Sequence, residues 1–325
     1  MTISNIGNAL EKLKVKKYFA KIIYWVFMYA LLIGLAYILL YPLLIMITKA
    51  FRPVEDMYNP SIVWISSGTT WENFKNAIYA LDFWDTLATT FRVVMVDTLI
   101  VLLICSMAGY GISRFKLKLK PIFVIIMILT IIVPIQTYIV PLYFEFVYFD
   151  FFGLGEIVGW FTGSAATINL VDSEFSLYIM NLFGSGLRSG LFILVFMRFF
   201  QGIPKELESA ARIDGANEFT IYSKIMLPNM KPAFIVVTVF AFVWNWNDFY
   251  YSRLLMRKTP LLSVRMDNIV ELVNNIVNQG GWGENVQSTP VLFAACLLFV
   301  TTPLIIYIIL QRGFAQSFER SGIVG

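Results

Sequence analysis

The sequence predicts an all-α fold, a polytopic membrane bundle of six transmembrane helices. Hydrophobic residues make up 58% of the 325 residues, charged residues make up 14%, and the mean hydropathy is +0.72. A water-soluble core could not enclose that much apolar surface. Six windows approach or exceed the roughly 20 apolar residues with which a helix crosses a bilayer. They lie near residues 21–48, 87–112, 121–145, 176–200, 232–255 and 289–311.

The first window, 21–48, is too long for a signal peptide and lacks a small-residue cleavage site after it, so we expect it to remain as an anchor. The segment that follows, near 50–86, contains a short helical stretch at Trp71–Ala77 with Thr69 or Thr70 as its N-cap. In the second window Arg92 and Asp97 lie on different sides of a helix, so each needs another partner. Arg188 is a candidate partner for Asp97.

The third window contains two prolines that weaken it as a helix. Pro134 and Pro141 each remove a backbone hydrogen bond, so we expect a loosened helix around Gln136 and Tyr138. In the fifth window, Trp244, Asn245, Asn247 and Asp248 combine aromatic faces with hydrogen-bonding groups, a mixture that suits sugar recognition. Such residues also join helices and subunits, so Gln136, Tyr138 and these four are equally open to a structural role.

The distribution of Lys and Arg predicts the orientation. With both termini in the cytoplasm, 16 of the 25 basic residues fall in inner segments, as short cytoplasmic loops require. The stretch 146–175 contains acidic residues and no Lys or Arg, so we place it outside. Four basic residues on the outer side, from the end of the fifth window into the loop before the sixth, oppose this trend: Arg253, Arg257, Lys258 and Arg265. No linker or repeat divides the chain, so we expect one transmembrane domain over 1–325.

Several function classes are disfavoured by composition. Histidine is absent, which removes the commonest general acid or base and the commonest metal ligand. Cys105 and Cys296 both lie in apolar runs and receive no catalytic or metal role. No Gly-Lys pair occurs, so the chain has no P-loop for ATP, and its basic residues form no patch typical of nucleic-acid binding. We therefore predict no catalytic residues, no cofactor in this chain and no nucleic-acid partner.

The loop at 201–231 has the most informative pattern in the chain. Gly202 and Pro204 indicate a helix start, and Glu206 and Glu208 suit the positive end of its dipole. A second short helix follows Gly215 and is expected to stop at Pro228. Two short helices joined near Gly215 would make a compact docking element. The alternative is a helical hairpin that only connects two spans.

These residues carry a resemblance to a known family. Ala210-Ala211, then Gly215, then Ile225-Met-Leu-Pro228 look like the EAA loop of ABC importer permeases. Ile203-Pro-Lys-Glu-Leu, Ile213-Asp-Gly-Ala216 and Trp246-Asn-Asp-Phe249 are similar to the carbohydrate-uptake branch, the relatives of the maltose permease, which are type I importers. Matches extend from about residue 71 to the C-terminus.

The resemblance implies a prokaryotic cytoplasmic-membrane permease for a sugar or oligosaccharide. Its partners would be a second permease subunit in a heterodimer, two ATPase subunits that bind ATP and Mg, and an extracytoplasmic solute-binding protein. The residues implied in ATPase coupling are Glu206, Glu208, Ser209, Ala210, Ala211, Asp214, Gly215, Ile225, Leu227 and Pro228. Ser209 stands where the family usually has a glutamate, and Glu206 or Glu208 could replace that acid.

The resemblance also assigns a contact for the binding protein. Gly280, Gly281, Trp282 and Gly283 match in position the loop that reaches into the binding protein in maltose-type permeases, although an ordinary surface loop fits equally well. Two alternatives stay open: an ion-gradient-driven secondary transporter, and an ABC importer for a non-sugar solute such as a glycerol phosphate.

Overall fold

The computed structural model describes residues 3–59, 61–62, 64, 66–151, 153–164, 166–278 and 288–322. The first part of the chain forms α1 (Ile3–Ala50), η1 (Val54–Tyr58), α2 (Glu72–Leu81), α3 (Phe83–Arg114), α4 (Lys120–Ile132), η2 (Ile135–Thr137), α5 (Ile139–Val147) and α6 (Leu154–Thr162). The remainder forms α7 (Glu174–Leu182), α8 (Ser189–Gln201), α9 (Lys205–Ile213), α10 (Glu218–Thr220), η3 (Ile221–Met226), α11 (Leu227–Asn229), α12 (Lys231–Trp246), α13 (Tyr250–Leu255), α14 (Leu262–Asp267), α15 (Ile269–Asn278) and α16 (Ser288–Gly322).

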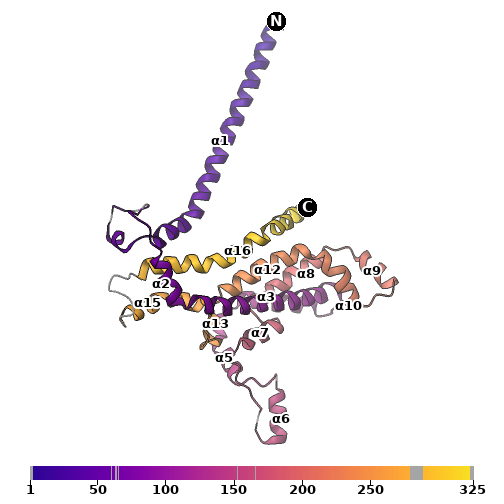
Figure 1. Ribbon diagram of the computed structural model, residues 1–325. Coiled ribbons are helices and arrows are strands. Elements are labelled where there is room, and N and C mark those ends of the chain that lie inside the picture. The colour runs from indigo at the N-terminus through magenta and orange to yellow at the C-terminus, as the bar shows by residue number, and fades with distance from the viewer. Residues whose placement is uncertain are drawn as a thin grey trace.

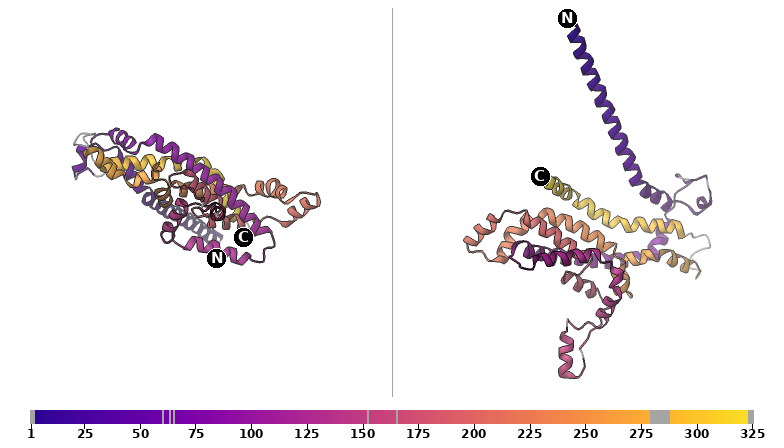
Figure 2. Two further views of the ribbon diagram at one scale, coloured as in Figure 1. Left: turned by 90° about the horizontal axis from the view of Figure 1, so that it is seen from below. Right: turned by 180° about the vertical axis from the view of Figure 1, so that it is seen from behind.

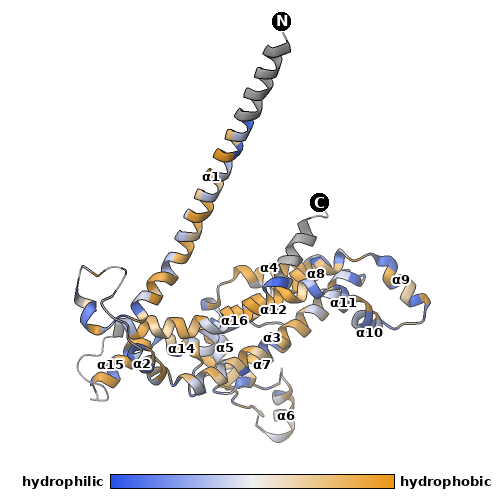
Figure 3. Cartoon of the chain, turned by 45° about the horizontal axis from the view of Figure 1, so that its top comes forward, coloured by the Kyte–Doolittle hydropathy of each residue, from blue (hydrophilic) through white to orange (hydrophobic). Residues whose placement is uncertain are grey.

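The predicted all-α architecture is confirmed. Helices α3, α8, α12 and α16 lie along one another in an elongated bundle, with α9 and α10 at one end and α2 and α15 at the other (Figure 1). Helix α1 contacts α16 near its own C-terminal end and then extends away from the bundle, as the view from behind also shows (Figure 2). The bundle helices are mostly apolar along their length, whereas α9 to α11 carry more hydrophilic residues (Figure 3).

Three of the six predicted windows are continuous helices. Among the described residues, Lys17–Ala50, Phe83–Arg114 and Thr289–Gly313 are long and apolar enough to cross a membrane, and a fourth candidate is the bent pair Glu218–Asn229 and Lys231–Trp246. The other three windows each contain a break: α4 is followed by α5, α7 by α8, and α12 by α13. The number of six spans therefore stays a prediction.

The break after α4 confirms the expected effect of proline. Val133 is extended, with ψ of 118°, because the ring of Pro134 disfavours helical geometry in the residue before it. Pro134 is itself extended, with ψ of 141°. Pro141 is tolerated inside α5 because it lies in the first turn, where amide groups have no helical acceptor.

The breaks after α7 and α12 involve turns that the hydropathy windows do not reveal. Gly184 and Arg188 both have left-handed backbone conformations, with φ of 67° and 60°, and α8 begins directly after Arg188. Asp248 lies two residues before α13, and its Oδ2 accepts hydrogen bonds from the Ser252 amide at 2.8 Å and the Ser252 hydroxyl at 2.7 Å. This capping compensates for the backbone amides that the break leaves free.

The short helix in the first loop forms close to the expected place. Helix α2 begins at Glu72 and continues to Leu81, four residues beyond the prediction. Of the two threonines proposed as its start, Thr70 is the one whose Oγ1 accepts from the Glu72 amide, at 3.1 Å. Asn73 then fixes α2 to the end of α1, because its Nδ2 donates to the carbonyls of Ala50 and Arg52 at 2.9 Å.

Close packing of α3 against α8 depends on Gly109. A Cβ at this position would lie 2.7 Å from Phe196 Cβ and 2.9 Å from the Met197 amide nitrogen. Small residues let membrane helices approach in this way, since lipid provides little hydrophobic drive for their association. Gly111, on the same helix, has far more room: its Cβ would meet only Phe115 Cδ2, at 3.9 Å.

We expect Gly109→Ala to separate α3 from α8 and to destabilise the protein by about 1–3 kcal/mol, the usual cost of overpacking. Thermal unfolding of the purified full-length protein measures the change. The matched control is Gly111→Ala, which should leave the melting temperature unchanged or raise it; equal losses in both variants would contradict this account of the α3–α8 contact.

Candidate functional site

The loop at 201–231 folds into two short helical segments joined by a tight turn. Helix α9 ends at Ile213, and Gly215 then adopts a left-handed conformation with φ of 83°. The Ala216 amide donates to the Ala211 carbonyl at 2.9 Å, which closes the end of α9. Asn217 caps the second segment by accepting from the Thr220 amide at 2.8 Å. Two helices meeting near Gly215 confirm the sequence prediction.

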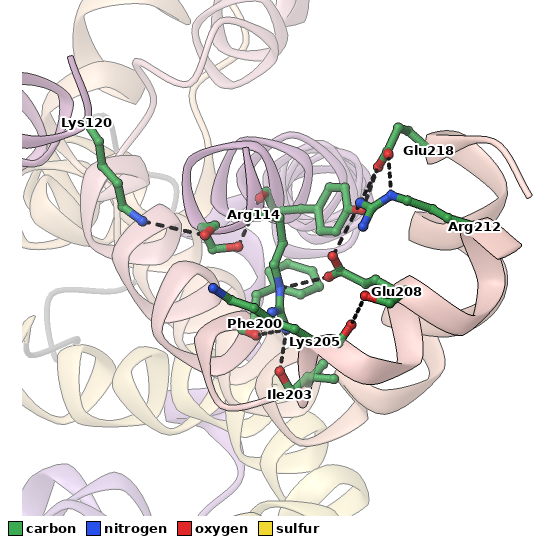
Figure 4. Close-up of polar contacts among 11 residues, drawn as sticks. Arg114, Lys120, Phe200, Ile203, Lys205, Glu208, Arg212 and Glu218 are labelled. Atoms are coloured by element: carbon green, nitrogen blue, oxygen red, sulfur yellow. Dashed lines mark hydrogen bonds and ion pairs between the residues drawn. The ribbon is translucent and has the colours of Figure 1, made fainter. Parts of the chain in front are cut away.

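A buried ion pair attaches α9 to the bundle. Arg114, the last residue of α3, lies with its Nε 2.9 Å from Glu208 Oε1 on α9, and the two side chains are only 3% and 5% exposed (Figure 4). The guanidinium also donates to the carbonyls of Phe200 and Ile203, the latter at 2.7 Å. The end of α3 therefore holds both the start of the loop and α9.

The same contacts continue to the second segment. Arg212 lies 3.4 Å from Glu208 Oε2, and its Nε donates to Glu218 Oε1 at 2.9 Å (Figure 4). This hydrogen bond lowers the pKa of Glu218 and raises that of Arg212. Tyr110 on α3 donates to Glu218 Oε2 at 3.3 Å, so both segments connect to α3.

The second segment is anchored by buried side chains. Ile221, Tyr222 and Met226 lie in the main core cluster together with Phe196 and Phe200 of α8. Tyr222 also forms a hydrogen bond of 2.7 Å with Ser106 of α3. The segment contains a π-helical turn at Ile221–Met226, passes Pro228 and ends at Asn229, so the predicted stop at Pro228 is one residue too early.

The predicted coupling residues divide into exposed and buried groups. Ala211 and Glu208 are buried, at 7% and 4% exposure, and Ile225 and Leu227 are half-buried. The exposed members are Glu206, Ser209, Ala210, Asp214, Gly215 and Pro228. Of the two acids offered in place of the missing glutamate at 209, only Glu206 has its side chain at the surface.

Two further residues complete the exposed face of the loop and were missed in the sequence. Ile213 is 86% exposed and Phe219 is 71% exposed, and they flank the turn at Gly215. An apolar side chain beside a glycine turn in an otherwise polar segment is the signal that could have found them. Arg114 is one of the 16 basic residues assigned to inner segments, and the sequence indicated no role for it beyond its charge.

The predicted substrate-pathway residues occupy different environments. Asn245 and Asp248 line a small cavity with Asp97 and Asn181. Its volume of about 20 Å³ is enough for one water molecule. Trp244 packs between Phe192 and Phe240. Asn247, Gln136 and Tyr138 are exposed, and the Tyr138 hydroxyl is 2.7 Å from that of Tyr251.

The charged residues of α3 have the separate partners that the sequence required. Arg92 pairs with Glu174 at the start of α7. Asp97 accepts a hydrogen bond of 2.7 Å from Asn181, not from Arg188, so that candidate pairing was wrong. The guanidinium of Arg188 instead lies 5.7 Å from the ring centroid of Trp244, where the left-handed turn before α8 directs it.

Two further sequence predictions concern sites for ligands or partners. Gly280, Gly281, Trp282 and Gly283 lie outside the described residues, which stop at Asn278 and resume at Ser288. Within the described ranges, no group of three or more Cys, Asp and Glu side chains could hold a metal ion.

Comparisons with known proteins agree on one family. The family model described as "Binding-protein-dependent transport system inner membrane component" matches residues 100–320. The arabinooligosaccharides transport system permease protein AraQ of Halalkalibacterium halodurans is 23% identical over 295 residues, which are 90% of this chain and 93% of AraQ. The sn-glycerol-3-phosphate transport system permease protein UgpE of Escherichia coli is 23% identical over 297 residues, 90% of this chain and 94% of UgpE.

A solved structure shares the fold. It is the crystal structure of a bacterial ABC transporter involved in the import of the acidic polysaccharide alginate. One of its chains matches with a TM-score of 0.65 and 20% identity, covering 89% of this chain and 95% of that chain.

Replacing Glu208 with alanine should release α9 from the bundle, because the guanidinium of Arg114 would remain buried without its acid. Removing one member of a buried pair costs about 3–5 kcal/mol. Amide hydrogen exchange across residues 205–222 should accelerate accordingly. Glu206→Ala, an exposed change on the same helix, should alter stability by less than about 0.5 kcal/mol. Similar exchange rates in the two variants would argue against the Arg114–Glu208 pair as the attachment of α9.

Proposed function

Because the chain belongs to the family of inner membrane components of binding-protein-dependent transport systems, we propose that it is the permease subunit of an ATP-driven importer of a sugar or oligosaccharide. The observation that carries this proposal is the paired-helix loop at 201–231, attached to α3 through Arg114 and Glu208. The chain is a transport component and not an enzyme.

In this proposal the exposed face of α9 and the Gly215 turn bind a separate ATPase subunit. Ile213 and Phe219 supply apolar surface, and Glu206 supplies an exposed charge. The small residues Ala210 and Gly215 allow the ATPase to approach the backbone closely. Movement of the ATPase would reach the spans through the Arg114–Glu208 pair, since α3 packs along α8 and α12. Ile225, Leu227 and Pro228 belong to the segment that passes this motion to α12.

The partners follow from the same division of labour. ATP and Mg would be bound by two ATPase subunits, because this sequence has no P-loop. A second permease subunit would complete the translocation pathway and cover part of the apolar surface of α1. A solute-binding protein outside the cell would deliver the solute to the outer face of the permease. This arrangement requires both termini and α9 on the cytoplasmic side, in agreement with the distribution of Lys and Arg.

A sugar or oligosaccharide is the favoured solute. The relative AraQ is named for arabinooligosaccharides, and the chain exposes aromatic rings and polar groups near the breaks in its spans. UgpE, named for sn-glycerol-3-phosphate, matches over the same share of the chain and keeps a glycerol phosphate as the second candidate. Transport driven by an ion gradient is the rival mechanism.

The direct test is uptake of a panel of labelled oligosaccharides and sn-glycerol 3-phosphate into proteoliposomes containing the full transporter and its binding protein. We expect accumulation that requires ATP on the side of the vesicle membrane that corresponds to the cytoplasm. This accumulation should persist when ionophores abolish proton and sodium gradients. Uptake that follows an ion gradient and ignores ATP would contradict the proposal.

Ile213→Ser should weaken association with the ATPase subunit at least tenfold, because an apolar side chain would be lost from the centre of the docking face. Co-purification of the ATPase with the tagged permease measures it. The control is Phe161→Ser on α6, a residue that is also 86% exposed but lies far from α9 (Figure 1). Unchanged co-purification with Ile213→Ser, or equal loss in both, would remove Ile213 from the interface.

A further inference from the structure

A surface cavity of about 400 Å³ is lined by residues in and next to α5 and α13. These two helices lie away from the α9 end of the bundle (Figure 1). Its volume falls in the usual range for small-molecule sites, about 300–1,000 Å³. The lining residues are Ile139, Tyr143, Phe249, Tyr250, Arg253, Leu254 and Arg257. Three aromatic rings and two arginines therefore meet in one hollow.

Both arginines belong to the group of four basic residues that oppose the predicted membrane orientation. The four differ in whether they pair with a carboxylate. Within the described residues, three of the four have a carboxylate partner: Arg253 with Asp267 at 3.2 Å, Lys258 with Asp172 at 3.7 Å, and Arg265 with Asp82 at 3.7 Å. Arg257 has no carboxylate partner among these residues. Its Nη1 instead donates to the hydroxyl of Tyr143, another lining residue, at 3.4 Å.

The backbone around Arg257 is held in place for this arrangement. Asp172 Oδ1 accepts from the amides of both Arg257 and Lys258, at 2.7 and 3.0 Å. Asp172 thereby neutralises Lys258 and fixes the chain, while the guanidinium of Arg257 is left to face Tyr143. Arg253 is positioned differently, with its guanidinium carbon 5.1 Å from the ring centroid of Phe249.

We propose that this cavity binds an acidic sugar, with the carboxylate of a uronate residue paired to Arg257. Aromatic faces suit the apolar side of a pyranose ring, and guanidinium groups bind carboxylates with paired hydrogen bonds. Arg253, whose charge is already balanced by Asp267, would donate to ring hydroxyls. The inference rests on the proposed function and narrows its solute class to acidic oligosaccharides.

The test is equilibrium binding to the assembled transporter in lipid nanodiscs without the binding protein. The probes are a labelled galacturonate trimer, the galactose trimer of the same linkage, and glycerol 3-phosphate. The galacturonate trimer should bind about tenfold tighter than the galactose trimer, the value of one charge-assisted contact. Glycerol 3-phosphate, which lacks a ring to stack on Tyr143, Phe249 or Tyr250, should bind more weakly than the acidic trimer.

Arg257→Gln should abolish the preference for the acidic trimer, and Arg257→Lys should restore part of it. Lys258→Gln is the matched control: it removes the neighbouring charge, which does not line the cavity, and should keep the preference. The inference is overturned if neither trimer binds, if both bind equally, if the preference survives Arg257→Gln, or if glycerol 3-phosphate binds best. ATP-dependent uptake of neutral sugars would leave the proposed function standing in each of these cases.

Discussion

The ion pair between Arg114 and Glu208 is the contact on which the arrangement of the loop depends. Burying two charges costs several kcal/mol for each ion unless the geometry and additional hydrogen bonds compensate. Here the guanidinium is also bonded to the carbonyls of Phe200 and Ile203, and the carboxylate to Arg212. Such a pair adds little net stability over an apolar contact, but removing either partner would leave an uncompensated buried charge. The pair therefore holds α9 beside the end of α3.

That constraint explains how a small surface helix can be tied mechanically to the membrane. Arg114 is the last residue of α3, and α3 packs on α8 through a glycine that leaves no room for a side chain. A force on α9 would thus act on a long helix and not on a loose linker. The core cluster around Tyr222 and Phe200 provides a second attachment, so α9 and the segment at 218–229 are both attached to the same end of α3.

The breaks in the spans follow a different physical rule. Backbone groups at membrane depth need partners within the protein, so an interrupted helix must be capped by side chains. Asp248 does this for α13, and Asn181 satisfies Asp97 beside the same water-sized cavity. Polar residues that suggested a solute pathway in the sequence therefore include some that maintain the fold. The more open aromatic and arginine-lined hollow lies next to them, between α5 and α13.

The sequence by itself determined the membrane class, the all-α fold, the family resemblance and the position of the paired helices around Gly215. These are properties of neighbouring residues, since a membrane helix satisfies its backbone locally and a turn needs only its own glycine. Tertiary structure alone decided that Glu208 is buried while Glu206 is exposed, that Asp97 pairs with Asn181, and that Arg257 has no acidic partner among the residues that the structure describes. Each depends on a partner far away in the chain, and a charge has no preferred partner until packing has placed one within reach.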